Sequence, residues 1–412
     1  MENVKKFAYY LKKSGLRQTM RLVLGHVWGS VRVLLFRSGA NLCWNAKALE
    51  VASALAGKTV MVFTPSVEWN FLFQRAQQMA HSFAQQPDTA VLFLTTQRHY
   101  DSFFAVHAVE PGVFLINECL ANRIDQLTRD ARKVVSCVYN IAGVPLLAHY
   151  HSDQLEYEYV DDLTVTVSGT DDLEEKLRIH RQLLERADLT VATAKKLYDE
   201  ALQVSRKVVF APNAADYAFF SAPAEPNPAL HKAAQGYTCV LEYYGALASW
   251  FDYDLVRAVA ERHPDWLWLL IGKKIDNDME RSGIERLPNV RYVPSVPYQE
   301  LPGCIACADV MTIPFVLNEI TAATSPVKLF EYMASKKPIL TSDMDECRRY
   351  ASVRIYHDAD SFIRLAEQAL AERNDPAYLA QLEREAQENT WSSRARQVLD
   401  ALQDSEKKEL PL

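Results

Sequence analysis

The sequence of 412 residues has no unbroken apolar run of roughly eighteen residues, the length that a membrane-spanning helix needs. Its most apolar early stretch, residues 27–36, is short and interrupted by Arg32. We also expect no secretory signal, because the early lysines precede neither an uninterrupted apolar segment nor a cleavage site. We therefore expect a protein that is made in the cytoplasm and stays there.

Cysteine pairs and glycine-rich nucleotide loops are scarce. The seven cysteines are an odd number in a chain too long for a disulfide-framed secreted domain. Cys304 and Cys307 form a lone C-x-x-C, without a second such pair or a histidine pair at zinc spacing. We therefore expect reduced thiols and no metal site. Neither half has G-x-G-x-x-G after a strand pattern, which disfavours a dinucleotide oxidoreductase.

Acidic residues are nearly absent from residues 1–48, which hold nine lysines and arginines and one glutamate, a net charge of +8, in a chain whose net charge is −7. Basic residues interleaved with leucine and Trp28 are typical of an interfacial helix on an anionic membrane. A helix packed on the body of the protein fits this segment equally well. Nucleic-acid binding is disfavoured, because no nucleic-acid-binding motif accompanies the arm.

From residue 59 onward, β-rich apolar runs alternate with helical patterns, which predicts an α/β protein with parallel sheets wrapped by helices. The strand patterns lie at 59–64, 90–95, 112–116, 133–139, 154–160, 188–192, 207–211, 238–244, 266–271, 290–293, 309–314, 338–341 and 353–356. The helical patterns lie near 71–86, 120–131, 172–187, 194–203, 252–263, 298–307, 326–335, 359–372, 376–388 and 391–403.

The composition changes at residues 212–236, which are rich in proline, alanine and asparagine and have no clear periodicity. This stretch is the best candidate for a linker. The resulting division is a basic amphipathic extension (1–57), a first Rossmann-like domain (58–212), a linker (213–236), a second Rossmann-like domain (237–375) and C-terminal helices packing back on the first domain (376–412). Ligands of such sheets bind at the carboxyl ends of the strands, so the cleft between the domains is the expected site.

The most informative stretch is residues 318–341. Ser325 suits an N-cap and Pro326 the first helical position, which leaves the backbone N–H groups of Val327 and Lys328 for an anion at the positive end of the helix dipole. Glu331 lies on the same face as Lys328, and its carboxylate can accept two hydrogen bonds from a ribose diol. The alternative is a surface helix with an ordinary Lys–Glu pair.

Residues 324–334 (TSPVKLFEYMA) followed by 337–341 (KPILT) resemble the donor-binding signature of the retaining GT-B glycosyltransferases of family 4. More narrowly, they resemble bacterial members that build cell-surface polysaccharides. Three further segments are similar to the same family, in the right order: 65–78, 244–255 and 289–302. The resemblance covers the chain from Thr59 to the last helix.

This resemblance implies the GT-B fold, two Rossmann-like domains facing each other across a cleft, with the acceptor domain first and the donor domain second. It implies that Glu331 binds the ribose of the donor. It also implies that the donor diphosphate is bound by Thr324, Ser325, Pro326, Val327 and Lys328. Gly245 and Ala246 would let the backbone approach the phosphates or the sugar, and Gly272 and Lys273 follow the next strand. A plain turn and a solvated lysine are the alternatives for these two pairs.

The sequence departs from the family pattern at three places. The first glutamate of the family's E-x7-E motif is Ala323 here, so its role passes to Asn318, Glu319 or Thr321, or is lost. The basic pair often found after the first turn of the donor domain is missing from residues 246–254, and Lys273, Lys274 or Lys328 is left to compensate. Lys336 stands where relatives often end the helix with glycine.

Catalytic side chains are expected in the first domain. Asp161 and Asp162 follow a strand at its carboxyl end, and His151 lies in the preceding loop. A carboxylate there can stabilise charge at the anomeric carbon, whereas the alternative is a capped turn and a surface histidine. Trp69 and Arg75 are candidates for the acceptor side, with a core position as the alternative for the tryptophan.

Our functional prediction is a retaining, metal-independent and cofactor-free glycosyltransferase that moves a sugar from a nucleoside-diphosphate-sugar to a growing glycan. The acceptor would be a polyprenyl-linked surface polysaccharide, and residues 1–48 would place the enzyme on the inner face of the plasma membrane. Two alternatives stay open: a catalytically degenerate relative that binds sugar nucleotides or a partner, and an epimerase-type GT-B enzyme that acts on the donor alone.

Overall fold

The computed structural model describes residues 44–45, 47–69, 73–96, 106–166 and 172–404, together with five single positions before residue 44. The predicted basic arm, residues 1–48, lies almost entirely outside the described residues. The chain divides into two compact units, the first made of Met1–Phe71 and Pro87–Asp153 and the second of Leu72–Gln86 and Gln154–Leu412. These units are sets of residues in mutual contact, and they do not test the domain boundaries that we drew from the sequence. Those boundaries stay predictions.

Unit 1 is built on a mostly parallel sheet. Its strands are β1 (Thr59–Phe63), β2 (Thr89–Thr95), β3 (Val106–Glu110), β4 (Val113–Asn117) and β5 (Lys133–Val138), in the spatial order β3-β4-β2-β1-β5. The pairs are parallel apart from β3 with β4. β1, β2 and β4 are buried along their whole length, which is why they read as unbroken apolar runs. The short helices of this unit are η1 (Glu118–Arg123), α3 (Ile124–Leu127) and η2 (Ile141–His149).

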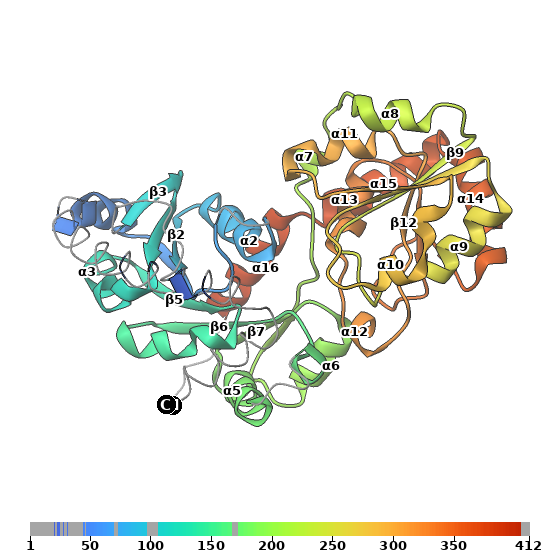
Figure 1. Cartoon of the computed structure of the whole chain (residues 1–412). Helices are drawn as coiled ribbons and strands as arrows, with labels where there is room; N and C mark the ends of the chain where they lie inside the picture. The colour runs from blue at the N-terminus through green and yellow to red at the C-terminus, as the bar shows by residue number, and fades with distance from the viewer. Residues whose placement is uncertain are drawn as a thin grey trace. The chain divides into compact units, whose positions relative to one another are not determined.

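Unit 2 begins with three parallel strands, β6 (Gln154–Tyr159), β7 (Leu189–Ala192) and β8 (Val208–Phe210), in that order. The helices beside them are α2 (Arg75–Ala84), α4 (Leu163–Thr166), α5 (Leu173–Arg186), α6 (Lys195–Leu202) and the last helix, α16 (Trp391–Asp404). α16 packs against α2 and β7, so this helix lies beside elements that precede it by some two hundred residues or more (Figure 1).

The rest of unit 2 is a fully parallel six-stranded sheet in the order β11-β10-β9-β12-β13-β14. Its strands are β9 (Cys239–Tyr244), β10 (Trp266–Ile271), β11 (Val290–Val293), β12 (Val310–Ile313), β13 (Ile339–Ser342) and β14 (Val353–Tyr356). Counted from β9, this is the 3-2-1-4-5-6 order of a dinucleotide-binding fold. The order reverses between β9 and β12, and ligands of such sheets bind beyond the carboxyl ends at that point.

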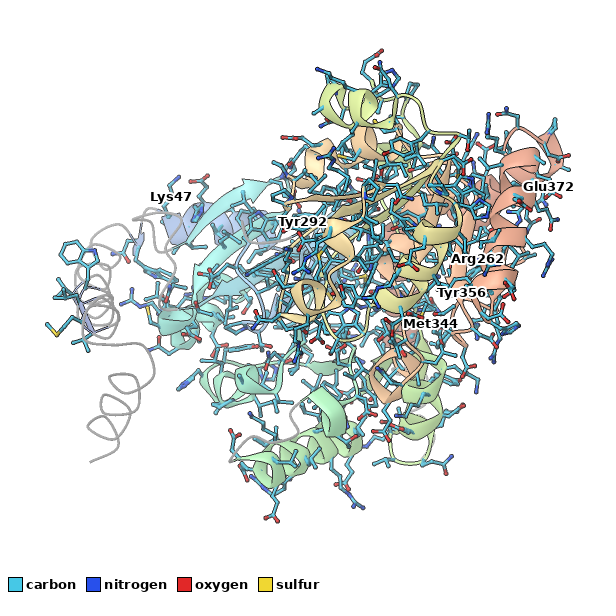
Figure 2. All side chains as sticks on the ribbon, turned by 45° about the vertical axis from the view of Figure 1, so that its right-hand side comes forward. Lys47, Arg262, Tyr292, Met344, Tyr356 and Glu372 are labelled. Carbon is cyan, nitrogen blue, oxygen red and sulfur yellow. The ribbon has the colours of Figure 1, made fainter. Side chains whose placement is uncertain are left out.

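Helices cover the six-stranded sheet in two groups. α9 (Tyr253–Arg262) and α14 (Ala359–Glu372) pack together, and α13 (Val327–Ala334) packs with α15 (Pro376–Glu388) (Figure 1). Trp268 of β10 stacks on Phe362 of α14 at 5.5 Å, and Tyr356, labelled in Figure 2, meets the same ring edge-on at 5.0 Å. The remaining short helices are α10 (Asp278–Ser282), η3 (Ile284–Arg286), η4 (Tyr298–Glu300), α11 (Leu301–Ile305) and α12 (Glu319–Ala322).

The stretch expected to be the linker, residues 213–236, holds two short helices that the sequence did not predict, α7 (Tyr217–Ser221) and α8 (Pro228–Ala234). The reason is local capping. The side chain of Asp216 accepts a hydrogen bond from the Phe219 N–H, and Asn227 accepts from the first turn of α8, which begins with proline.

Within the described ranges, no helix has both the length and the apolar character needed to cross a membrane. The same part of the chain brings together no group of three or more histidine, cysteine, aspartate or glutamate side chains able to hold a metal ion.

Candidate functional site

Two glycines end the neighbouring strands β9 and β10 with positive φ angles, 139° at Gly245 and 150° at Gly272. A Cβ atom on Gly272 would lie 1.8 Å from the carbonyl oxygen of Gly245, so no other residue fits there. A Cβ atom on Gly245 would lie 3.0 Å from Cε of Lys328. The missing side chains therefore bring the two backbones together and leave the β9 turn against the lysine of α13.

The helix α13 starts one residue later than the sequence suggested. Ser325 is not its N-cap and Pro326 is not its first helical residue: Pro326 occupies the cap position with extended backbone, and no side chain in the described part of the protein caps the helix. The Ser325 hydroxyl oxygen instead accepts the backbone N–H of Asn213 at 3.1 Å. The first-turn N–H groups of Val327 and Lys328 have no acceptor within the helix, so they remain available at its positive end.

Lys328 extends from this first turn over two aromatic rings. Its Nζ lies 5.2 Å from the ring centre of Tyr243 and 5.1 Å from that of Phe315, which is cation–π geometry. Burial lowers the pKa of Lys328 to about 8, and the nearby Glu331 opposes this effect. The ammonium group is therefore mostly charged at neutral pH, and a bound anion would hold it in that form.

Glu331 is 5% exposed, and its Oε2 accepts a hydrogen bond from the Tyr244 hydroxyl at 2.5 Å. Burial raises the pKa of Glu331 to about 7, against the opposing effects of the Tyr244 hydrogen bond and the charge of Lys328. The alternative of an ordinary surface Lys–Glu pair is therefore wrong. The carboxyl group is buried, and no ion pair joins it to Lys328 in the described part of the chain.

Tyr244 is the residue of this site that sequence reasoning missed. It is the last residue of β9, is 6% exposed, and packs edge-on against Tyr332 of α13 at 5.2 Å. The available signal was its place at the carboxyl end of a central strand, directly before Gly245. What the sequence does not give is the partner, because Glu331 lies 87 positions away.

The other residues predicted on the donor side are placed as follows. The carbonyl of Ala246 accepts the Tyr243 hydroxyl at 2.7 Å, and that of Gly272 accepts the hydroxyl of Tyr292, labelled in Figure 2, at 3.0 Å. The Thr324 hydroxyl donates to the Ile320 carbonyl at 2.7 Å. Lys273 has an exposed side chain at the end of β10.

Of the three lysines considered as substitutes for the missing basic pair, Lys274 is already engaged. Its Nζ lies 3.0 Å from Glu280 and 2.7 Å from Glu285, over the ring of Tyr292. Lys328 is the one that lies against the Gly245 turn.

Two of the residues considered in place of the missing glutamate, Asn318 and Thr321, form hydrogen bonds at the start of α12. The Asn318 side chain accepts the Thr321 N–H at 3.0 Å and caps α12, while the Thr321 hydroxyl donates to the Val316 carbonyl at 2.7 Å. Glu319, in the first turn of α12, is exposed. Ala323 itself is 3% exposed. Of the three residues considered in place of the missing glutamate, Glu319 is the one that carries a carboxylate, and its side chain is exposed.

The two residues predicted on the acceptor side are both buried. Trp69 is 8% exposed and packs edge-on against Phe93 at 5.2 Å, in agreement with the alternative of a core position. Arg75, in α2, is 5% exposed and forms a two-pronged ion pair with Glu158 of β6, at 2.8 and 3.2 Å. Its guanidinium group therefore serves protein contacts.

The predicted catalytic residues occupy different settings. Asp162 is 5% exposed, lies 2.5 Å from Lys196 Nζ, and accepts the Thr164 N–H at 2.9 Å. Burial acts to raise the pKa of Asp162, but the hydrogen bonds from Lys196 and Thr164 outweigh it and lower that pKa. Asp162 thus caps the first turn of α4. Asp161 has an exposed side chain, and the exposed ring of His151, which belongs to unit 1, lies 3.2 Å from Asp153.

Comparison with known proteins shows that the chain is similar to glycosyltransferases. The model of the family described as "Glycosyl transferases group 1" matches residues 247–381, a stretch that includes Gly272 and the whole of α13. Over 301 residues the chain is 27% identical to TuaH of Bacillus subtilis (strain 168), named for teichuronic acid biosynthesis as a glycosyltransferase. That match covers 68% of this chain and 75% of TuaH.

Two solved structures illustrate the similarity of fold. Sucrose-phosphate synthase from Thermosynechococcus elongatus superposes with a TM-score of 0.59 at 14% identity, over 84% of this chain and 98% of that one. HepE of Anabaena, solved with UDP-glucose, gives a TM-score of 0.59 at 12% identity, over 84% and 99% of the two chains. At such identities the likeness concerns the fold, which is GT-B with two Rossmann-like domains.

Proposed function

Since the chain is a glycosyltransferase with the GT-B fold, we propose that it moves a sugar from a nucleoside-diphosphate-sugar to a cell-surface polysaccharide under construction. In this proposal the transfer retains the configuration of the sugar and needs neither a metal ion nor another cofactor. The donor lies at the carboxyl ends of β9 and β10, against the start of α13.

The arrangement of α13 is the observation that carries the proposal. An uncapped helix start, a lysine held over two aromatic rings and a buried carboxyl group lie within five consecutive residues, 327–331. Backbone N–H groups and an ammonium ion are suited to a diphosphate, and a carboxylate one turn further on is suited to the hydroxyls of a ribose. The glycines at the two strand ends allow the ligand to approach the backbone.

In this proposal the reaction is driven by stabilisation of the departing diphosphate. The Lys328 charge and the positive end of α13 face the position at which negative charge develops when the bond to the sugar breaks. The same charges fulfil the task for which other enzymes use a divalent cation, which supports a reaction without metal. We propose that the configuration of the sugar is retained because the sequence resembles a retaining family. In that family the leaving diphosphate itself takes the proton of the acceptor hydroxyl.

On the acceptor side we propose Asp161 as the carboxylate that meets the transferred sugar. It follows β6 at its carboxyl end and has an exposed side chain, whereas Asp162 is engaged by Lys196 and Thr164. The acceptor is proposed to be a lipid-linked glycan, on the strength of the similarity to TuaH and of the basic, leucine-rich residues 1–48. Co-sedimentation of the full chain with anionic vesicles, compared with neutral vesicles, tests the membrane part of this proposal.

A second candidate is a catalytically degenerate relative that binds a sugar nucleotide without turning it over. The specific observation in its favour is Ala323, which stands where the family carries a glutamate, while Asn318 and Thr321 are occupied by the cap of α12. Turnover of any donor together with an acceptor would eliminate this candidate. Product formed from the donor alone would favour an epimerase.

The donor site is tested by thermal unfolding with UDP, GDP, dTDP and CMP in the presence of EDTA. We expect one diphosphate to stabilise the wild type, by about 2.7 kcal/mol at a hundredfold excess over its dissociation constant. Glu331→Ala should lose this stabilisation, and Glu367→Ala, an exposed glutamate of α14, should keep it. Stabilisation that survives in Glu331→Ala, or that no nucleotide provides, would contradict the assignment of the site.

A further inference from the structure

Asn213 forms two hydrogen bonds with Ser325, which lies two residues before the first helical residue of α13. Its backbone N–H donates to the Ser325 hydroxyl oxygen at 3.1 Å, and its side-chain Nδ2 donates to the Ser325 carbonyl oxygen at 2.7 Å. Asn213 is 7% exposed and Ser325 is 6% exposed, so both hydrogen bonds are shielded from water. One residue, 112 positions away in the chain, thus donates to both oxygens of Ser325, in the turn that leads into α13.

Arg75 determines which way the Asn213 amide faces. Nη1 of Arg75 donates to Oδ1 of Asn213 at 3.3 Å and to the Pro212 carbonyl at 3.2 Å. A guanidinium group has only donors, so it selects the amide oxygen and turns the NH2 group toward Ser325. Glu158 keeps the arginine in place through its two-pronged buried ion pair.

The two hydrogen bonds between Asn213 and Ser325 affect the start of α13. From the N-cap position, which the sequence suggested for Ser325, a serine hydroxyl oxygen commonly accepts a first-turn N–H group. Here Ser325 stands one position before the N-cap, its hydroxyl oxygen accepts the Asn213 N–H, and no side chain among the described residues caps α13. Pro326, with φ of −70°, stiffens the same turn. The N–H groups of Val327 and Lys328 are left for a ligand.

We propose that Asn213 is a positioning residue for the donor diphosphate, holding the Ser325–Pro326 turn so that the first N–H groups of α13 stay uncapped and directed at the phosphates. This inference rests on the proposed function, because it assigns a task within the same donor site. Asn213 acts through Ser325 and contributes no atom to the ligand. A purely structural asparagine would support the fold but would leave the binding of phosphates unaffected.

Two substitutions separate these roles. Asn213→Asp has the same shape and retains an acceptor for Arg75, but it presents a carboxylate oxygen to the Ser325 carbonyl, so the hydrogen bond becomes a repulsion. Asn213→Ala removes the side-chain hydrogen bond to the Ser325 carbonyl without adding charge. Asn389 is a matched control: its Oδ1 accepts from Arg394 and its Nδ2 donates to a backbone carbonyl at 2.7 Å, but that carbonyl belongs to Glu385.

The experiment measures the dissociation constants of UDP, GDP and dTDP, and of the nucleoside corresponding to each, for the full-length chain by NMR titration. We expect Asn213→Asp and Asn213→Ala to weaken the preferred diphosphate by about tenfold, the worth of one buried hydrogen bond, with little change for its nucleoside. Asn389→Asp should bind both like the wild type. Either Asn213 variant suffices for the comparison if the other fails to fold.

The possible results distinguish the two proposals. If the wild type binds a diphosphate and Glu331→Ala loses it, but the Asn213 variants bind as tightly as the wild type, the role of Asn213 is refuted and the donor site stands. Equal losses for diphosphate and nucleoside would also refute it, because they indicate general damage. If the wild type binds none of the three diphosphates, the proposed function and this inference fail together.

Discussion

Removing the Tyr244 hydroxyl should change the pH dependence of donor binding in a defined direction. In the proposed site Glu331 must be ionised to accept hydrogen bonds from a ribose, and Lys328 must be protonated to bind the diphosphate. Burial raises the pKa of Glu331 to about 7 and lowers the pKa of Lys328 to about 8. The affinity of the wild type should therefore be highest between about pH 7 and pH 8 and fall on both sides.

The Tyr244 hydroxyl donates to Glu331 at 2.5 Å, and a hydrogen bond to a charged group contributes about 1.5–3 kcal/mol. Tyr244→Phe loses this stabilisation of the ionised form, so the pKa of Glu331 should rise. Taking the lower figure, the acid dissociation constant falls about tenfold, and the ionised fraction at pH 7 falls from about a half to about a tenth. The affinity at pH 7 should then be about fivefold weaker, with the acidic limb moved upward and the basic limb unchanged.

Isothermal titration calorimetry with the preferred nucleoside diphosphate at pH 6, 7, 8 and 9 measures both limbs. The control is Tyr253→Phe, which removes the hydroxyl of a tyrosine that is 8% exposed and whose oxygen has no hydrogen-bond partner among the described residues. An acidic limb at the same pH in Tyr244→Phe as in the wild type would refute the link between the two residues. A loss of affinity that is equal at every pH would refute it as well.

Three further predictions concern the charge, the turn and the buried ion pair. Lys328→Met should weaken the nucleoside diphosphate by about 1.5–3 kcal/mol in calorimetry and abolish the basic limb of the pH profile; an unchanged basic limb would mean that another group titrates there. Gly272→Ala should lower the unfolding temperature strongly, because its Cβ would lie 1.8 Å from the Gly245 carbonyl oxygen, whereas Gly283→Ala, with open space around the new atom, should cost about 1–2 kcal/mol from the strain of its positive φ alone. Arg75→Leu should cost about 3–5 kcal/mol in denaturant unfolding by removing the guanidinium group from buried Glu158, and Arg75→Leu with Glu158→Leu should recover much of this.

The sequence indicated the strands well because central strands of a covered parallel sheet are continuous apolar runs. β10, whose six residues are all buried, is the clearest case. β3 was missed for the opposite reason: it is a short edge strand, pairs antiparallel, and is buried only at Val106. The helices inside residues 213–236 were missed because their caps are local signals without any accompanying apolar period.

The site was predictable as far as its residues are close in sequence. Lys328 and Glu331 belong to one helix, and Gly245 could be recognised from the end of its strand. The contacts that adjust these groups join distant positions: Tyr244 meets Glu331, and Asn213 meets Ser325. The start of α13 was placed one residue early because the usual preference of serine for the N-cap yields here to a partner that only the tertiary structure supplies.

The central claim is that this site uses a nucleoside-diphosphate-sugar for transfer. Its most direct test is the release of nucleoside diphosphate from a panel of nucleotide-sugars, in EDTA, by the full chain with a lipid-linked glycan fraction as acceptor. We predict release from one donor that depends on the acceptor, is unaffected by EDTA and is lost in Glu331→Ala but kept in Glu367→Ala. Binding of a donor without any release, or release that EDTA abolishes, would contradict the account.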